Sequence, residues 1–282
     1  MRSAFLLLVL AAPGAAAVPA APVAAAPVFA PARFTVEVIG TGPDVILIPG
    51  LTASKNVWRP AIAALPGYRY HLIQVSGFAG APARGNARGE IVAPLAEEIA
   101  RYIREHRLVR PAIVGHSMGG TLALMVAARH PQRVGRVMVV DMLPQPAELL
   151  GASPGSLRGL ADTLRDLSGT PFGRGLIDSA VRMFGNDQVE NSRSDPDVVA
   201  RAAHELAVTD LTPELPRIAA PLTVLYASPD PSLAATADGV YRDAYAGDPA
   251  ARLVRVDGSG HMIMVEQPRR FAEELRKFLG GG

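Results

Sequence analysis

The sequence predicts an α/β fold: a mostly parallel, doubly wound sheet with an inserted helical cap. Three observations predict it. Short apolar runs rich in branched residues alternate with longer amphipathic stretches, which is the pattern of strands and helices around a parallel sheet. One long internal stretch contains no convincing strand. The 282 residues, 49% of them hydrophobic and 19% charged, are enough for one large globular domain.

The apolar runs and the amphipathic stretches place the elements in order along the chain. Strands are expected at 34–39, 45–48, 70–75, 112–115, 137–141, 222–226 and 253–256. Helices are expected at 58–65, 91–106, 119–130 and 267–279. In the second helix, Ile91, Leu95, Ile99 and Ile103 recur every four positions and form one apolar stripe. These helices should therefore pack on the sheet.

The stretch 143–216 breaks this alternation. It has helical pieces around 157–167, 176–184 and 198–208, separated by clusters of Gly, Pro, Asn and Ser. We interpret it as a cap inserted into a core formed by 33–142 and 217–282. An insertion at this point should lie over the carboxyl ends of the strands, where open α/β sheets bind ligands.

The N-terminal segment has the composition of an export signal. Arg2 precedes an apolar run at 4–12 and then small residues, so 1–20 is expected to be a signal peptide and 21–32 an Ala/Pro-rich linker. The prolines from Pro13 to Pro27 would break a membrane-spanning helix, which needs roughly 20 apolar residues. We therefore expect a periplasmic or secreted protein without a stable membrane anchor.

Composition excludes several kinds of chemistry and partner. The chain has no cysteine, so it forms no disulfide, thiolate zinc site or cysteine nucleophile. No block of Lys or Arg forms a groove for nucleic acid, and the net charge is only +2. We expect neither nucleic acid nor a metal or other cofactor as a partner, and the oligomeric state stays open.

The strongest motif is a Gly-x-Ser-x-Gly sequence between a predicted strand and a predicted helix. It comprises Gly115, His116, Ser117, Met118 and Gly119. A serine on such a sharp turn has a strained backbone, and side chains two residues away would collide with the neighbouring chain, so glycine is required there. Ser117 would stand above the sheet at a helix N-terminus, which favours developing negative charge. The pattern predicts a nucleophilic serine.

Here the chain resembles the α/β-hydrolase superfamily over nearly all of its expected mature length. Ile48-Pro49-Gly50-Leu51 resembles the strand-end loop of that family, often His-Gly-x, although Pro49 stands where many members have histidine. The resemblance implies an oxyanion hole formed by the backbone N–H groups of Leu51 and Met118. Ser76 replaces the aspartate of the family's Asp-x-x-Gly-x-Gly segment, a change we interpret as structural.

The resemblance also implies the base and the acid. His261 follows a predicted strand and precedes the last helix, where the family's catalytic histidine lies. Asp230, in the loop after 222–226, resembles the family's acid, and the catalytic triad would be Ser117, Asp230 and His261. Asp141, at the end of the preceding strand, is the rival position for the acid, and we favour Asp230.

The expected reaction is hydrolysis of a small or medium-sized, uncharged, moderately hydrophobic carboxylic ester through an acyl-enzyme. C–C bond hydrolase, amidase or aminopeptidase and acyltransferase activities remain alternatives on the same residues, and a non-catalytic binding protein is a further one. The candidate pocket walls are apolar side chains near these motifs: Trp58, Phe78, Met183, Phe184 and Met262.

Overall fold

A computed structural model describes residues 29–150 and 193–280, which form a seven-stranded mixed sheet. The spatial order is β1-β3-β2-β4-β5-β6-β7. β1 pairs antiparallel with β3, and every other pairing is parallel. The predicted fold class is confirmed.

The strands are β1 (Phe34–Ile39), β2 (Asp44–Ile48), β3 (Arg69–Val75), β4 (Ala112–His116), β5 (Arg136–Val140), β6 (Leu222–Ser228) and β7 (Arg252–Asp257). The helices are α1 (Arg59–Ala64), α2 (Val92–Glu105), α3 (Met118–Arg129), α6 (Pro196–Val208), α7 (Ala234–Ala244), α8 (Ile263–Glu266) and α9 (Pro268–Gly280). Every predicted strand is present, because strands covered on both faces form nearly continuous apolar runs that the sequence displays.

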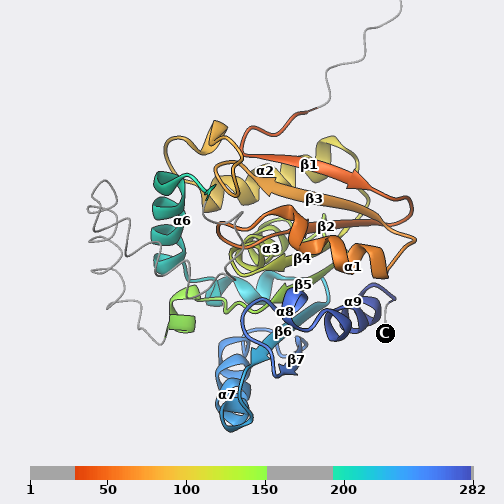
Figure 1. Ribbon diagram of the computed structural model, residues 1–282, viewed down its shortest axis with the longest axis vertical. Coiled ribbons are helices and arrows are strands. Elements are labelled where there is room, and N and C mark those ends of the chain that lie inside the picture. Colours follow the sequence, from red (N-terminus) through yellow and green to blue (C-terminus); the bar gives the residue numbers. More distant parts are fainter. Residues whose placement is uncertain (1–28, 151–192, 281–282) are drawn as a thin grey trace, which may run out of the picture.

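The helices cover both faces of the sheet. α2, α3 and α7 contribute to one buried cluster, and α1, α8 and α9 contribute to the other. In Figure 1, α7 lies beside β6 and β7, and α6 lies beyond the carboxyl ends of the parallel strands. The described ends of the expected cap are helical, since α6 is accompanied by 3-10 turns at Pro146–Leu150 and Thr212–Arg217.

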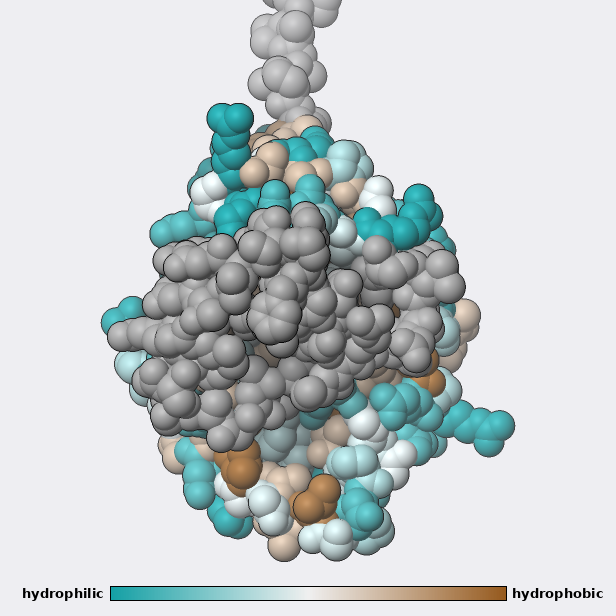
Figure 2. Space-filling model, turned by 60° about the vertical axis from the view of Figure 1, so that its left-hand side comes forward, coloured by the Kyte–Doolittle hydropathy of each residue, from teal (hydrophilic) through white to brown (hydrophobic). Residues whose placement is uncertain are grey.

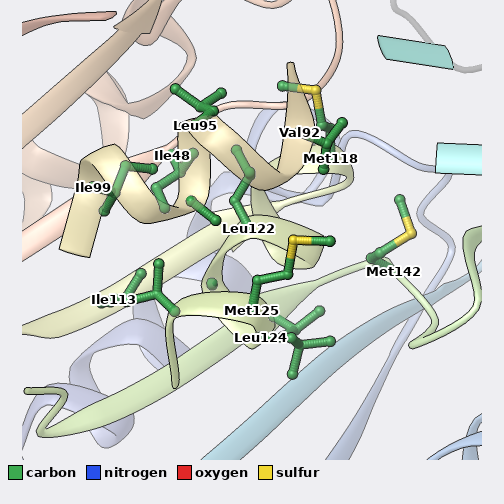
Figure 3. Packing of buried hydrophobic residues seen from close by; sticks show 14 of the residues in the cluster. Ile48, Val92, Leu95, Ile99, Ile113, Met118, Leu122, Leu124, Met125 and Met142 are labelled. Carbon is green, nitrogen blue, oxygen red and sulfur yellow. The ribbon is translucent and has the colours of Figure 1, made fainter. Parts of the chain in front are cut away.

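The larger core cluster forms where α2 and α3 pack on the middle of the sheet. Leu95 and Ile99 of α2 belong to the same packed cluster as Leu122 of α3, as Figure 3 shows. The four residues of the predicted α2 stripe are almost completely buried. Because α3 packs against α2, β4 and β5, nearly all its side chains are buried, and its N-terminus is fixed at the end of β4.

Two features were not predicted. α7 has no clear apolar stripe, because Tyr241 is its only fully buried residue. Residues 29–32, the end of the expected linker, pack on α2: the Arg101 guanidinium lies 4.2 Å from the centre of the Phe29 ring, and Ala32 N–H donates to Glu98 at 2.6 Å. The folded part of the chain therefore already includes Phe29.

The described surface is mainly hydrophilic. Apolar residues appear as separate spots rather than a broad patch in the view of Figure 2. The large apolar residues that are exposed lie far apart in the sequence: Val38, Val109, Val208, Leu233 and Val240. In the described ranges, no helix combines the length and the hydropathy needed to cross a membrane.

Candidate active site

Ser117 lies in the strained turn that its motif predicts. Its backbone has φ 52° and ψ −124°, between the end of β4 and the first residue of α3. A Cβ on Gly115 would lie 2.0 Å from the carbonyl oxygen of Gly119, and a Cβ on Gly119 would lie 2.2 Å from that of Ile48. Both glycines are therefore required by backbone contact, and they allow the chain to turn and present a partly exposed serine.

The loop that follows β2 passes directly beside this serine. A Cβ on Gly50 would lie 3.0 Å from the Cβ of Ser117, so the loop approaches the nucleophile closely. Leu51 comes next, and Thr52 has a left-handed backbone with φ 64°. Met118 begins α3, where backbone N–H groups have no partner inside the helix. In the described part of the chain, neither Leu51 N–H nor Met118 N–H donates to another residue. Both are available to a developing oxyanion.

His261 is held by a carboxylate, and that carboxylate belongs to Asp141. The Nδ1 atom of His261 lies 2.7 Å from Oδ2 of Asp141. An ionised carboxylate only accepts hydrogen bonds, so Nδ1 carries the proton and Nε2 is left as the basic nitrogen. Asp141 follows β5 with a left-handed backbone, φ 52°, and is only 5% exposed. This pair is the arrangement that orients a general base.

The expectation that Asp230 orients His261 is wrong in this structure. Asp230 follows β6 and is exposed, and its carboxylate accepts a hydrogen bond from Ser232 N–H at 2.7 Å. It is the N-cap of the short 3-10 turn Pro231–Leu233. That bond lowers the pKa of Asp230, as expected for a capping carboxylate. The rival position, Asp141, supplies the contact.

The other oxygen of Asp141 has partners of its own. Oδ1 accepts hydrogen bonds from Ala227 N–H at 2.8 Å and from the Tyr241 hydroxyl at 3.0 Å. Ala227 lies in β6, next to β5 in the sheet, and Tyr241 lies in α7. Tyr241 was not among the predicted site residues, because the sequence pattern of α7 predicts no helix. The carboxylate is thus fixed on both sides, with Oδ2 directed at His261.

His116 connects the nucleophile turn to the His261 loop. Its Nε2 donates to the backbone carbonyl of His261 at 3.0 Å, and the two imidazole rings are 4.7 Å apart between centroids. Burial and the neighbouring His261 lower the pKa of His116 to about 3, so its ring stays neutral. Since His116 directly precedes Ser117, this contact brings the base to the nucleophile.

The His116 contact places the His261 loop next to the turn that carries Ser117. In serine hydrolysis the nucleophile must pass its proton to the imidazole, and this contact between the nucleophile and the base often tightens only when substrate binds. The arrangement has a strained serine, an oriented imidazole beside it and two backbone donors, so it can perform acyl transfer once the serine hydroxyl rotates toward Nε2.

The candidate pocket walls are mostly core residues. Trp58 is completely buried and packs against Phe271, with 5.9 Å between ring centroids. Phe78 and Met262 are buried in the two core clusters. Met183 and Phe184 lie outside the described residues. These three described side chains stabilise the fold around the site.

The base of the expected cap is attached to the loops of the core. Ser194 Oγ accepts a hydrogen bond from Ala79 N–H at 3.0 Å and donates to the Thr52 carbonyl at 3.4 Å. In α6, Glu205 accepts hydrogen bonds from Val92 N–H at 2.7 Å and Ile91 N–H at 2.9 Å. The start of α6 is therefore fixed close to the loop that carries Leu51.

The described residues offer no metal site. Nowhere in 29–150 or 193–280 do three His, Asp or Glu side chains gather closely enough to hold an ion.

Comparison with known proteins agrees with this fold. The family model for the alpha/beta hydrolase fold matches residues 43–268. A pimeloyl-[acyl-carrier protein] methyl ester esterase from Aeromonas hydrophila is 27% identical over 263 residues, which cover 87% of this chain and 99% of that protein.

Two solved structures show the same fold. A thermophilic esterase from Thermogutta terrifontis superposes with a TM-score of 0.71 at 21% identity, covering 88% of this chain and 93% of that one. The enol-lactonase from Burkholderia xenovorans gives a TM-score of 0.68 at 20% identity, with 88% and 96% covered.

Proposed function

The chain belongs to the α/β-hydrolase family, and we propose that it is a serine esterase whose catalytic residues are Ser117, His261 and Asp141. The observation that carries this proposal is the His261–Asp141 hydrogen bond of 2.7 Å beside a strained Ser117. A histidine whose Nδ1 proton is held by a buried carboxylate presents Nε2 as the nitrogen that accepts the serine proton.

The reaction follows from these positions. Ser117 Oγ attacks the acyl carbonyl carbon while His261 Nε2 takes its proton, and Asp141 stabilises the imidazolium that forms. Leu51 and Met118 N–H groups bind the oxyanion, each contributing roughly 3 kcal/mol in comparable sites. His261 then protonates the leaving alcohol. Water, activated by the same imidazole, releases the acyl group from Ser117.

An ester with uncharged, moderately hydrophobic groups is the substrate class we propose. The Aeromonas hydrophila relative is named as a methyl ester esterase, which supports ester cleavage over amide cleavage. The described flanks of the site are neutral: Leu51, Met118 and the neutral His116 surround Ser117.

The test is hydrolysis of short-chain p-nitrophenyl esters by the wild-type protein, Ser117→Ala and Ser232→Ala. Ser232 is an exposed serine on the neighbouring loop, so its variant is the matched control. We expect ester turnover and covalent labelling by a fluorophosphonate in the wild type and in Ser232→Ala, and neither in Ser117→Ala. Turnover that survives in Ser117→Ala would refute the proposal. Anilides of the same acyl group compare amide with ester cleavage directly.

We also propose that residues 1–20 direct export, on the grounds of Arg2 and the apolar run that follows it. Cell fractionation tests this. The full-length chain should be found processed outside the cytoplasm, and a chain lacking 1–20 should stay inside. Full-length protein retained unprocessed in the cytoplasm would contradict the proposal.

A further inference from the structure

The buried phenol of Tyr241 approaches the carboxylate of Asp141 from the side opposite His261. Its hydroxyl donates to Oδ1 at 3.0 Å, and both side chains are only 5% exposed. We propose that Tyr241 is a positioning residue, which holds the Asp141 carboxylate so that Oδ2 faces His261. This inference rests on the proposed function and assigns α7 a part in it.

Each carboxylate oxygen of Asp141 has its own hydrogen-bond partners. Oδ1 takes Ala227 N–H and the Tyr241 hydroxyl, and Oδ2 takes the His261 ring. A buried carboxylate with one donor missing can rotate about its last bond to regain a partner, which would turn Oδ2 away from the imidazole. Ala227 N–H belongs to a β-strand and stays in place. Tyr241 is the side chain on which the orientation depends.

The ring of Tyr241 is held by its neighbours rather than by its hydroxyl. It stacks on Tyr226 with centroids 4.3 Å apart and an interplanar angle of 17°. Tyr245 lies on the same helix end, nearly parallel at 6.5 Å and 6°. Phenylalanine at position 241 should therefore keep the ring in place and remove only the donor.

The phenol remains a donor over the working pH range. Burial and the negative charge of Asp141 raise the pKa of Tyr241 well above its ordinary value, so the hydroxyl stays protonated. The titratable groups that face this contact are Asp141, His261, Tyr226 and Tyr245, and Asp238 of α7 is bonded instead to Tyr226 at 2.7 Å. A hydrogen bond from a neutral donor to a buried carboxylate is stronger than one between neutral groups.

Tyr245 provides a matched control. It is as deeply buried as Tyr241, it ends the same helix, and its hydroxyl donates to the backbone carbonyl of Met142 at 2.7 Å. Tyr245→Phe removes one buried hydroxyl without touching a carboxylate. A merely structural role for Tyr241 predicts the same behaviour for Tyr241→Phe and Tyr245→Phe.

The experiment compares kcat, KM and the pH dependence of kcat/KM for p-nitrophenyl ester hydrolysis in the two variants. For Tyr241→Phe we expect kcat to fall about tenfold, as for loss of one charge-assisted hydrogen bond. KM should change little, and the acid limb of the pH profile should move to higher pH, because the carboxylate loses a donor that shared its charge. Tyr245→Phe should keep the wild-type kcat and profile.

Proton NMR gives a readout that does not need turnover. The low-field signal of the His261 Nδ1 proton should shift in Tyr241→Phe and stay unchanged in Tyr245→Phe. Wild-type kcat and an unshifted signal in Tyr241→Phe would overturn the inference, as would equal losses in both variants. Wild-type protein without Ser117-dependent turnover would instead reject the proposed function, so the two failures are distinguishable.

Discussion

Replacing Asp141 with asparagine tests whether the carboxylate of this residue orients His261, as proposed. Asn is the same size, so its effect depends on which atom faces His261. Oδ1 of Asp141 accepts from Ala227 N–H and the Tyr241 hydroxyl. An asparagine will place its amide oxygen there, because its NH₂ group would face two donors in that position. The NH₂ group then faces His261 Nδ1.

This orientation reverses the tautomer of His261. A donor facing Nδ1 requires Nδ1 to accept, so the ring proton moves to Nε2, where the proton of Ser117 has to go. The equivalent change in a serine protease lowers kcat by about 10⁴ for the same reason. We expect a loss of about 10³ to 10⁴ for Asp141→Asn, which corresponds to roughly 4 to 5.5 kcal/mol of transition-state stabilisation.

The matched control is Asp230→Asn, the same chemical change one strand further along the sheet. Asp230 is exposed and caps Ser232 N–H, and an amide oxygen can also accept that bond. We expect its kcat to stay within about twofold of the wild type. The assay is steady-state hydrolysis of a p-nitrophenyl ester, with circular dichroism to show that both variants fold. A large loss in Asp230→Asn with an active Asp141→Asn would refute the reasoning.

Three further predictions concern the stability of the structure around the site. Gly119→Ala puts a Cβ 2.2 Å from the Ile48 carbonyl oxygen, so it should lower the free energy of unfolding by about 3 kcal/mol or more. The control Gly280→Ala adds a Cβ in open space and should leave the free energy of unfolding unchanged, and urea unfolding measures both variants. Glu205→Ala should lower the free energy of unfolding by about 1 to 2 kcal/mol, because the first turn of α2 loses its acceptor; an unchanged urea midpoint would contradict this. His116 has its pKa lowered from 6.5 to about 3 by burial, so the unfolded chain binds a proton that the native chain does not. The contribution of His116 to the free energy of unfolding is therefore constant above about pH 6.5 and falls by about 1.4 kcal/mol per pH unit below it. In urea titrations between pH 6.5 and 5, His116→Gln should remove this part of the pH dependence.

The strands and the strained turn at Ser117 were predictable because their signals are local. β4 and β5 are short apolar runs. The glycines on either side of Ser117 lie where the backbone of another segment leaves no room for a Cβ atom. α7 was not predictable from periodicity, because it is held by one buried tyrosine rather than by an apolar stripe. Its packing depends on Tyr226, a residue of another element.

The acid was not predictable from position alone. Asp141 and Asp230 each follow a parallel strand, and β5 and β6 are neighbours, so their carboxyl ends lie at the same edge of the sheet. Which of them His261 reaches depends on how the loop after β7 folds back. One local signal was present: Asp230 directly precedes Pro231, and an aspartate before proline is typical of an N-cap.

In the proposed arrangement Asp230 takes no part in catalysis, and it is exposed just after β6, the neighbour of the strand that carries Asp141. The chain has no cysteine, so Asp230→Cys would introduce the sole thiol among 282 residues. A maleimide dye attached there would sit at an exposed position after β6, the strand next to the one that carries Asp141, and its emission can be followed while a ligand is added. Because Asp141 after β5 contacts His261, position 230 can be labelled for spectroscopy without changing any of the proposed catalytic residues.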